Sequence, residues 1–461
     1  MQAFKGRFLT ALLLVFGLLG AQASRAELVA TAEDTKVVYL TPLRNGLSSI
    51  TLVWPIDRLA QDRVTALKAG LSSVVSGGTS SRSPYKIHEF LGLKGIRQNV
   101  SSSGRNLMLT VTAPDEVFPE TLVHLENLLL EPEYSSGWYA REVQRITPGL
   151  SVRTREPENV LSEVAEFIEF EPDDARNDES GDEFRFGRPS QVILRSGNQE
   201  AERRAGKLIK KLPSAEAEWK FSFAKWAEAL TGAEKRPFAL PPGTIYYEDP
   251  ETTEMLIQLV KAEEFENERD QIGANLLLNY IGAGQDSEMF RIIRQEMRAS
   301  YDPGSDFIVM EKNRAIISLS ATVEAVRWPE IYEEIRDIYE NARSGNIESE
   351  RLALKHEILN RRYVHNFFTA PAWGALQYLH EYPDGVRGDV RLPVFEALET
   401  ASLTEVITNS DAHLPPLEDF LLVLIGGGMA PTEALKSKGY CALPENTPLS
   451  FCLDMLSNGE N

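Results

Sequence analysis

The chain has few cysteines, and both lie close to its C-terminus. Among its 461 residues only Cys441 and Cys452 are cysteines. So small a number excludes a fold built on disulfides, and the stability of the protein must come from apolar cores. In an oxidising compartment the two thiols could close a small loop worth ~2–3 kcal/mol. They could also stay free, and the sequence leaves both alternatives open.

Long apolar runs are missing beyond the N-terminal region. No later stretch reaches the ~20 apolar residues that a membrane helix needs, so we expect no membrane span. The N-terminus itself has a charged start (Lys5, Arg7), an apolar run over 12–19, and small residues up to Ala26. This order is typical of a secretory signal peptide. We therefore expect residues 1–26 to be a signal peptide and the mature protein to be periplasmic or secreted.

An excess of basic residues is also missing. The formal net charge is −20, and such a surface repels phosphate backbones and anionic lipid, so nucleic acid is not expected as a partner. Residues 169–183 hold eight of the acidic side chains. No calcium-loop spacing is present there, and we interpret the segment as a solvated connector.

Histidine is scarce, and its six copies are scattered. No two of them stand at the spacing that would place both as zinc ligands on one face of a helix. A lone histidine is usually a surface or core residue, so the sequence offers no histidine-based metal site. The six are His88, His124, His356, His365, His380 and His413.

One order of elements occurs twice along the chain. In the first half we expect a strand with Ile50, Leu52 and Trp54 on one face, then helices and a second strand. The expected ranges are a helix over 63–75 that stops at Gly77-Gly78-Thr79, a helix over 84–91, a strand over 107–113 and a helix over 116–130.

The second half repeats this order. The expected ranges are a strand over 255–260, a helix over 266–280 that breaks at 282–284, a helix over 287–299, a strand over 317–323 and a helix over 328–342. The two glycine breaks lie about 205 residues apart, in equivalent places. We therefore predict an α+β protein made of two homologous halves, each a mainly antiparallel sheet backed by helices.

Composition suggests where these halves begin and end. Three prolines (Pro237, Pro241, Pro242) mark residues 236–243 as the linker between the halves. We expect the first half over 27–235, the second over 244–440, and a tail over 441–461.

Several segments, in the correct order, resemble the insulinase/pitrilysin-type zinc peptidases. Ser287-Glu288-Met289-Phe290-Arg291-Ile292-Ile293-Arg294, with Tyr301 seven residues later, is similar to the signature of that family's C-terminal half. The turn at Gly78-Thr79 and the run Phe186-Gly187-Arg188-Pro189 resemble further family elements, and the likeness covers roughly residues 35–440. The resemblance implies two halves that face each other like a clam shell around a chamber that holds polypeptide.

The resemblance also shows what this chain lacks. The family's chemistry uses His-x-x-Glu-His on a helix, in which two histidines and a distant glutamate hold zinc and the other glutamate activates water. Here the matching positions hold Ala69, Ser72 and Ser73, and the region of the third ligand, 148–150, has no carboxylate. We therefore expect no metal and no cofactor in this chain, and zinc only in a partner subunit.

Arg294 and Tyr301 are the family positions that remain. In the family they help to hold substrate near the metal from the opposite half, because an arginine can bind a peptide carbonyl and a tyrosine hydroxyl can stabilise an oxyanion. The Gly-Leu that the family usually has between them is absent here, where the sequence is Arg298-Ala299-Ser300. The first half is also trimmed, with little room between Pro189 and Gln191 for a helix that the family carries there.

Three hypotheses follow for the function. The first is an exported, catalytically silent subunit that binds polypeptide and complements a zinc-bearing relative through Arg294 and Tyr301. The second is an envelope scaffold or peptide-binding protein with no part in catalysis. The third, an independent zinc peptidase, conflicts with the residues at 69, 72 and 73.

Overall fold

The computed structural model describes most of the chain, with gaps. The described residues are 27–29, 35–44, 46–56, 61–103, 105–133, 136–146, 157–169, 184–213, 237–249, 252–386, 388–390, 392–427, 430–437, 439–443 and 447–459. The expected signal peptide, residues 148–150 and nearly all of the acidic segment lie outside the described residues.

The first unit is built on a six-stranded sheet with the order β12-β2-β7-β3-β5-β4. Three of its five strand pairings are antiparallel, so the sheet is mixed with an antiparallel majority. In β3 the side chains of Ile50, Leu52 and Trp54 point to one face, where they pack against helices in a buried core. The strands are β2 (Lys36–Tyr39), β3 (Leu47–Pro55), β4 (Arg97–Ser103), β5 (Asn106–Pro114), β7 (Gln191–Arg195) and β12 (Gly388–Asp389), and the helices in that core are α2 (Gln61–Gly77), α4 (Phe118–Leu130) and α7 (Gln199–Lys211).

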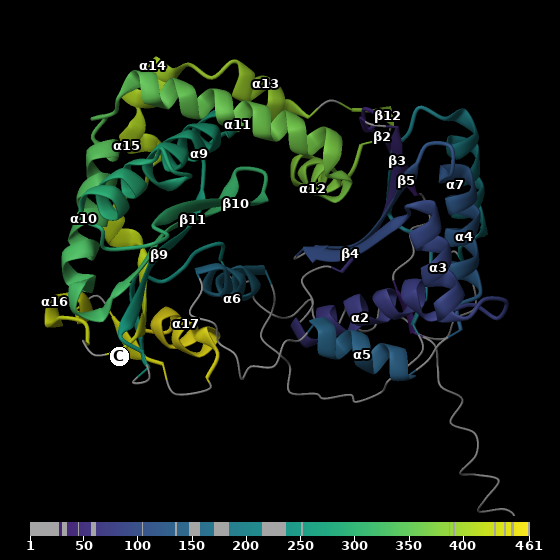
Figure 1. Ribbon diagram of the computed structural model, residues 1–461, viewed down its shortest axis with the longest axis horizontal. Coiled ribbons are helices and arrows are strands. Elements are labelled where there is room, and N and C mark those ends of the chain that lie inside the picture. Colours follow the sequence, from purple (N-terminus) through teal and green to yellow (C-terminus); the bar gives the residue numbers. More distant parts are fainter. Residues whose placement is uncertain are drawn as a thin grey trace, which may run out of the picture.

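The second unit has the same strand order and the same strand directions. Its sheet reads β14-β8-β13-β9-β11-β10 from the edge that corresponds to β12. This match confirms the expected fold class of two α+β halves, each backed by helices (Figure 1). The elements are β8 (Gly243–Glu248), β9 (Glu254–Glu264), β10 (Gly304–Glu311), β11 (Arg314–Glu324), β13 (Leu421–Gly426), β14 (Tyr440–Ala442), α9 (Glu268–Gly282), α10 (Trp328–Arg343) and α11 (Ser349–Thr369).

The remaining elements are short or lie at the edges of the two units. They are β1 (Glu27–Val29), β6 (Phe184–Phe186), α3 (Pro84–Lys94), α5 (Ser136–Ile146), α6 (Pro157–Glu169), the π-helix η1 (Phe290–Glu296), η2 (Ala325–Arg327), α12 (Pro371–Glu381), α13 (Pro393–Glu399), α14 (Leu403–Thr408), α15 (Ser410–His413), η3 (Leu417–Asp419), α16 (Glu433–Lys436) and α17 (Leu449–Ser457).

The two units exchange elements. Helix α6, from the first half of the sequence, buries Val160, Val164 and Phe167 against the second sheet. In return α12, from the second half, packs against the first sheet, and β12 extends that sheet at its edge. Because each sheet is covered on its second face by a helix from far along the chain, the boundary between the units does not follow the sequence in a single cut.

The C-terminal residues are part of the second unit rather than a tail. Strand β14 pairs with β8, and α17 packs in the core beside α6. Cys441 and Cys452 are joined by a disulfide between these two elements, and both are buried. The segment expected to be a plain linker is also packed, since Leu240 is buried in the same core.

The helix expected over 287–299 is shorter and differently wound than the sequence pattern predicts. It forms a π-helix over Phe290–Glu296. The glycine break before it has a steric reason, because a Cβ at Gly282 would lie 2.5 Å from the backbone nitrogen of Ser305. Glycine there allows β10 to approach the end of α9 closely.

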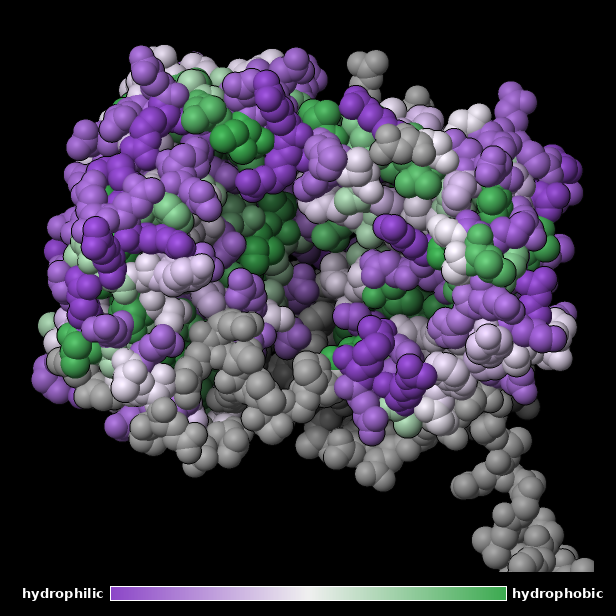
Figure 2. All heavy atoms as spheres, in the orientation of Figure 1, coloured by the Kyte–Doolittle hydropathy of each residue, from purple (hydrophilic) through white to green (hydrophobic). Residues whose placement is uncertain are grey.

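A hollow separates the surfaces of the two units (Figure 2). Among the described residues, no helix is both long and apolar enough to cross a membrane.

Candidate functional site

The helix that matches the zinc helix of the resembling family is α2, and its side chains do not suit a metal. Ala69, Ser72 and Ser73 are all buried. The Ser73 hydroxyl donates to the Gly70 carbonyl at 2.8 Å, so it is occupied within its own helix. A methyl and two hydroxyls cannot replace imidazole and carboxylate ligands. Within the described part of the chain, no group of three or more metal-ligating side chains is present.

One buried carboxylate near α2 was not anticipated from the sequence. Helix α5 packs against α2 and carries Glu142, which is 7% exposed. Arg145 Nε donates to Glu142 Oε2 at 2.8 Å. The carboxylate is therefore already neutralised, and a single group of this kind does not form a metal site. Its sequence signal, a glutamate on an amphipathic helix, is indistinguishable from that of a surface residue.

Arg294 and Tyr301 come together as one unit at the surface of the second half. The Arg294 guanidinium lies 4.1 Å from the ring centre of Tyr301 and also donates a hydrogen bond to the Tyr301 carbonyl. The same guanidinium lies 4.9 Å from the ring centre of Phe290. Tyr301 is 81% exposed, so the stacked pair is presented to the outside. No hydrogen bond or ion pair between described residues joins this pair to α2.

The backbone around the pair is unusual in two ways. Arg294 lies in the π-helix η1, a form that is rare and often found at functional sites. Arg298 has a φ of 51°, in the left-handed region that favours glycine. The glycine that the sequence comparison led us to expect between these two positions is absent, and an arginine adopts the left-handed conformation instead.

A buried charge network fixes the segment in front of η1. Lys355 on α11 is 3% exposed, and its ammonium donates to the Ala283 carbonyl and to Asp286 Oδ1, both at 2.5 Å. Burial lowers the pKa of Lys355, while Asp286 opposes that change. One turn earlier, Arg351 pairs with Glu288, which also binds Arg291. The start of η1 is thereby tied to α11, a relationship that sequence periodicity does not reveal.

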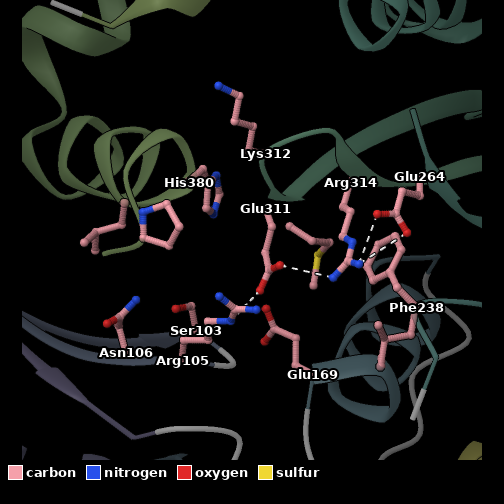
Figure 3. A pocket seen from close by; sticks show the side chains of 14 residues that line it. Ser103, Arg105, Asn106, Glu169, Phe238, Glu264, Glu311, Lys312, Arg314 and His380 are labelled. Atoms are coloured by element: carbon pink, nitrogen blue, oxygen red, sulfur yellow. Dashed lines mark hydrogen bonds and ion pairs between the residues drawn. The ribbon is translucent and has the colours of Figure 1, made fainter. Parts of the chain in front are cut away.

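A pocket of about 330 Å³ lies where the two units meet. Figure 3 shows the tips of the β4–β5 and β10–β11 hairpins facing each other there. Arg105 Nε lies 2.8 Å from Glu311 Oε1, which joins the two hairpins by an ion pair. Glu311 also pairs with Arg314, whose guanidinium binds Glu264 at 3.1 Å. The carboxylates of Glu264 and Glu311 are therefore both paired with arginines, and the Arg105–Glu311 pair links the two units at this pocket.

Two titratable groups with shifted pKa values lie beside the pocket. Burial lowers the pKa of His380 to about 4, so its ring is neutral at physiological pH. Burial, followed by the neighbouring Glu268 carboxylate, raises the pKa of Glu381 to about 7. The ammonium of Lys312 is 3.8 Å from Glu381 and offsets only part of this rise. The Glu268 carboxylate therefore disfavours the ionised form of Glu381.

Known proteins resemble this chain in a part of its sequence and in its fold. The family model described as the peptidase M16 inactive domain matches residues 197–358, a span that includes Arg294 and Tyr301. No curated protein sequence matches the chain.

Several solved structures are similar to this chain over nearly their whole length. A peptidase M16 inactive domain from Pseudomonas fluorescens is 14% identical, with a TM-score of 0.64 over 87% of this chain and 98% of that one. A protease from Helicobacter pylori is 12% identical, with a TM-score of 0.64 over 87% of this chain and 100% of that one. The periplasmic protease PqqL from Escherichia coli is 11% identical, with a TM-score of 0.59 over 88% of this chain and 45% of that one.

At these identities the solved structures establish the fold alone. The family model adds a sequence match over the region that contains Arg294 and Tyr301. The full sequence contains no His-x-x-Glu-His motif, and α2 carries no ligand at the matching positions. The resemblance stated from the sequence is supported in two ways: residues 197–358 match the peptidase M16 inactive domain, and the chain shares the fold of the solved structure of such a domain, while the zinc motif is absent from its sequence.

Proposed function

We propose that this chain is a non-catalytic subunit that pairs with a zinc-bearing relative and contributes Arg294 and Tyr301 to a joint peptide site. The observation that carries the proposal is the stacked pair itself. Arg294 orients Tyr301 from a π-helix, and the tyrosine ring is 81% exposed, without a covering element. An aromatic group held rigid yet exposed suits contact with another chain.

The first unit offers a second place where the chain can bind polypeptide without chemistry of its own. Strand β4 lies at the edge of the first sheet, and among the described strands it pairs only with β5, so we expect its other side to offer N–H and C=O groups for pairing. An extended peptide can add to such an edge as a further strand. The residues at 69, 72 and 73 cannot activate water, so cleavage of the bound peptide requires the metal of the partner.

We also propose export, with residues 1–26 as a signal peptide. The buried disulfide between Cys441 and Cys452 supports an oxidising compartment. One structure of the same fold is a periplasmic protease.

The test is an assay of peptide hydrolysis with a zinc-motif relative from the same genome. The relative is measured alone, with the wild-type chain, and with the Arg294→Ala or Tyr301→Phe variant. We expect the wild-type chain to raise kcat/KM and each variant to lose roughly tenfold or more of that gain. Tyr85→Phe is the matched control, because Tyr85 is 76% exposed on α3, away from the pair.

The outcomes separate the three hypotheses. Unchanged activity in the presence of Arg294→Ala and Tyr301→Phe would end the complementation proposal. Peptide binding that persists after both substitutions would favour the scaffold or peptide-binding protein. Near-stoichiometric zinc in the purified chain, with hydrolysis that a chelator abolishes, would favour the independent peptidase.

A further inference from the structure

We propose that Arg298 makes the surface around Tyr301 selective for polypeptide segments that carry acidic side chains. The surface consists of Arg294, Arg298, Tyr301 and Val326. The inference rests on the proposed function, in which this surface meets polypeptide, and it names the chemistry that the surface prefers.

The backbone at Arg298 is the first observation. Its φ of 51° costs a residue with a Cβ roughly 1–2 kcal/mol relative to the right-handed conformation. The neighbours on both sides are pinned, since Met297 N donates to Ile292 O and Ala299 N donates to Ile293 O, both at 2.9 Å. Glycine would adopt the same backbone conformation without that free-energy cost. A strained position held by a long, exposed side chain indicates that the side chain itself has a use.

The charges around Arg298 are the second observation. Arg291 lies 2.7 Å from Glu288 and 2.5 Å from Glu296, and Arg327 lies 3.2 Å from Glu330. The carboxylates of Glu288, Glu296 and Glu330 are therefore already paired. By contrast, neither Arg294 nor Arg298 forms an ion pair with any carboxylate among the described residues. On a chain with a net charge of −20, this surface therefore carries two arginines whose guanidinium groups have no carboxylate partner among the described residues.

The apolar part of the surface is the third observation. Tyr301 and Val326 are 81% and 71% exposed, more than any other large apolar side chain described in the second unit. Their segments are held together, because Ser300 pairs with Val323 and Arg327 donates to the Met297 carbonyl. A guanidinium matches a carboxylate with two parallel hydrogen bonds. The fitting ligand is an extended segment in which acidic and apolar side chains alternate.

The experiment measures binding of two fluorescent peptides to the full mature chain by anisotropy. One peptide alternates leucine with glutamate, and the other alternates leucine with glutamine. We expect the wild-type chain to bind the glutamate peptide at least roughly threefold tighter at low salt, with the preference shrinking as salt is added. We expect Arg298→Gly to remove most of this preference while leaving the affinity for the glutamine peptide unchanged.

The variant keeps the fold, because glycine adopts the same φ without strain. Arg336→Gln is the matched control, since Arg336 is exposed on α10 and already pairs with Glu333; the preference should survive in it. An unchanged preference in Arg298→Gly, or no preference in the wild-type chain, would overturn the inference while leaving complementation through Arg294 and Tyr301 intact. Failure to bind either peptide would overturn the inference together with the peptide-binding part of the proposed function.

Discussion

Arg294 fixes Tyr301 from two directions, with its guanidinium 4.1 Å from the centre of the ring and a hydrogen bond donated to the carbonyl of the same residue. The stack orients the aromatic ring, and the hydrogen bond closes the turn of chain between the two residues. Neither side chain is therefore independent of the other. Residues that act as a unit show non-additive losses when they are removed.

The first prediction concerns this coupling in the complex with a zinc-bearing relative. Arg294→Ala should leave Tyr301 without its orienting partner, so the double variant Arg294→Ala/Tyr301→Phe should lose little more activity than the worse single variant. We expect each single loss to be roughly tenfold to a hundredfold in kcat/KM. Losses that multiply in the double variant would show that the two side chains act separately.

The second prediction concerns the buried ammonium of Lys355. Its side chain is 4% exposed, and it lies 2.5 Å from Asp286, whose side chain is 45% exposed. Lys355→Met should leave the Ala283 carbonyl and Asp286 without their partner and lower the free energy of unfolding by about 2–3 kcal/mol in urea. Lys436→Met, which breaks the exposed pair with Glu433, should cost less than about 0.5 kcal/mol. Equal losses in the two variants would argue against a structural role for Lys355.

The third prediction concerns the strain at Arg298. Arg298→Gly should raise the free energy of unfolding by about 0.5 kcal/mol. Glycine removes the strain energy of the left-handed conformation, and this gain exceeds the free-energy cost of the extra conformational entropy that glycine gives the unfolded chain. Arg336→Gly, in the middle of α10, should lower it by about 1 kcal/mol. Thermal or urea unfolding distinguishes the two signs. Destabilisation by Arg298→Gly would mean that the arginine side chain contributes to the fold.

The fourth prediction is a pH dependence that arises from Glu381. Its pKa is about 7 in the folded protein, against an ordinary value of 4.5, so the carboxyl is harder to ionise when folded. The stabilisation that the protonated Glu381 carboxyl gives the folded protein is fully present below pH 4.5. It is lost as the pH rises through about 7. Glu381→Gln should therefore match the wild-type chain near pH 5 and exceed its stability by on the order of 2 kcal/mol near pH 8.

Urea unfolding of both proteins across this pH range provides the measurement for Glu381. The control is Glu399→Gln, because Glu399 is exposed at the end of α13; its difference from the wild-type chain should not change with pH. A Glu381→Gln difference that stays constant over the same range would mean that folding does not raise the pKa of Glu381.

The sequence predicted the repeated elements well, since alternation and helical spacing are local signals. The strand with Ile50, Leu52 and Trp54 and the helix from Trp328 appear as β3 and α10, with bounds close to the expected ones. The exchange of α6 and α12 between the units was not predicted. An amphipathic helix shows that it has an apolar face, but not which of two similar sheets that face covers.

The candidate site was predicted in part for a similar reason. A motif at fixed spacing pointed to Arg294 and Tyr301, and the structure brings these two side chains together. The partners that fix their segment, Lys355 and Arg351, lie fifty or more residues further on and belong to no motif. The π-helix was missed because Ser287 to Ala299 carries an ordinary helical stripe of apolar residues, and its widened turn follows from packing rather than from composition.

The most direct test of the central claim places a photo-crosslinker at position 301. Tyr301 is replaced by benzoylphenylalanine, and the chain is irradiated with a labelled peptide in the presence and absence of the zinc-bearing relative. A second chain carries the crosslinker in place of Leu354, which is 48% exposed on α11. Our account predicts peptide labelling from position 301 that increases when the relative is present, and little labelling from position 354. Labelling that is equal at the two positions, or independent of the relative, would contradict it.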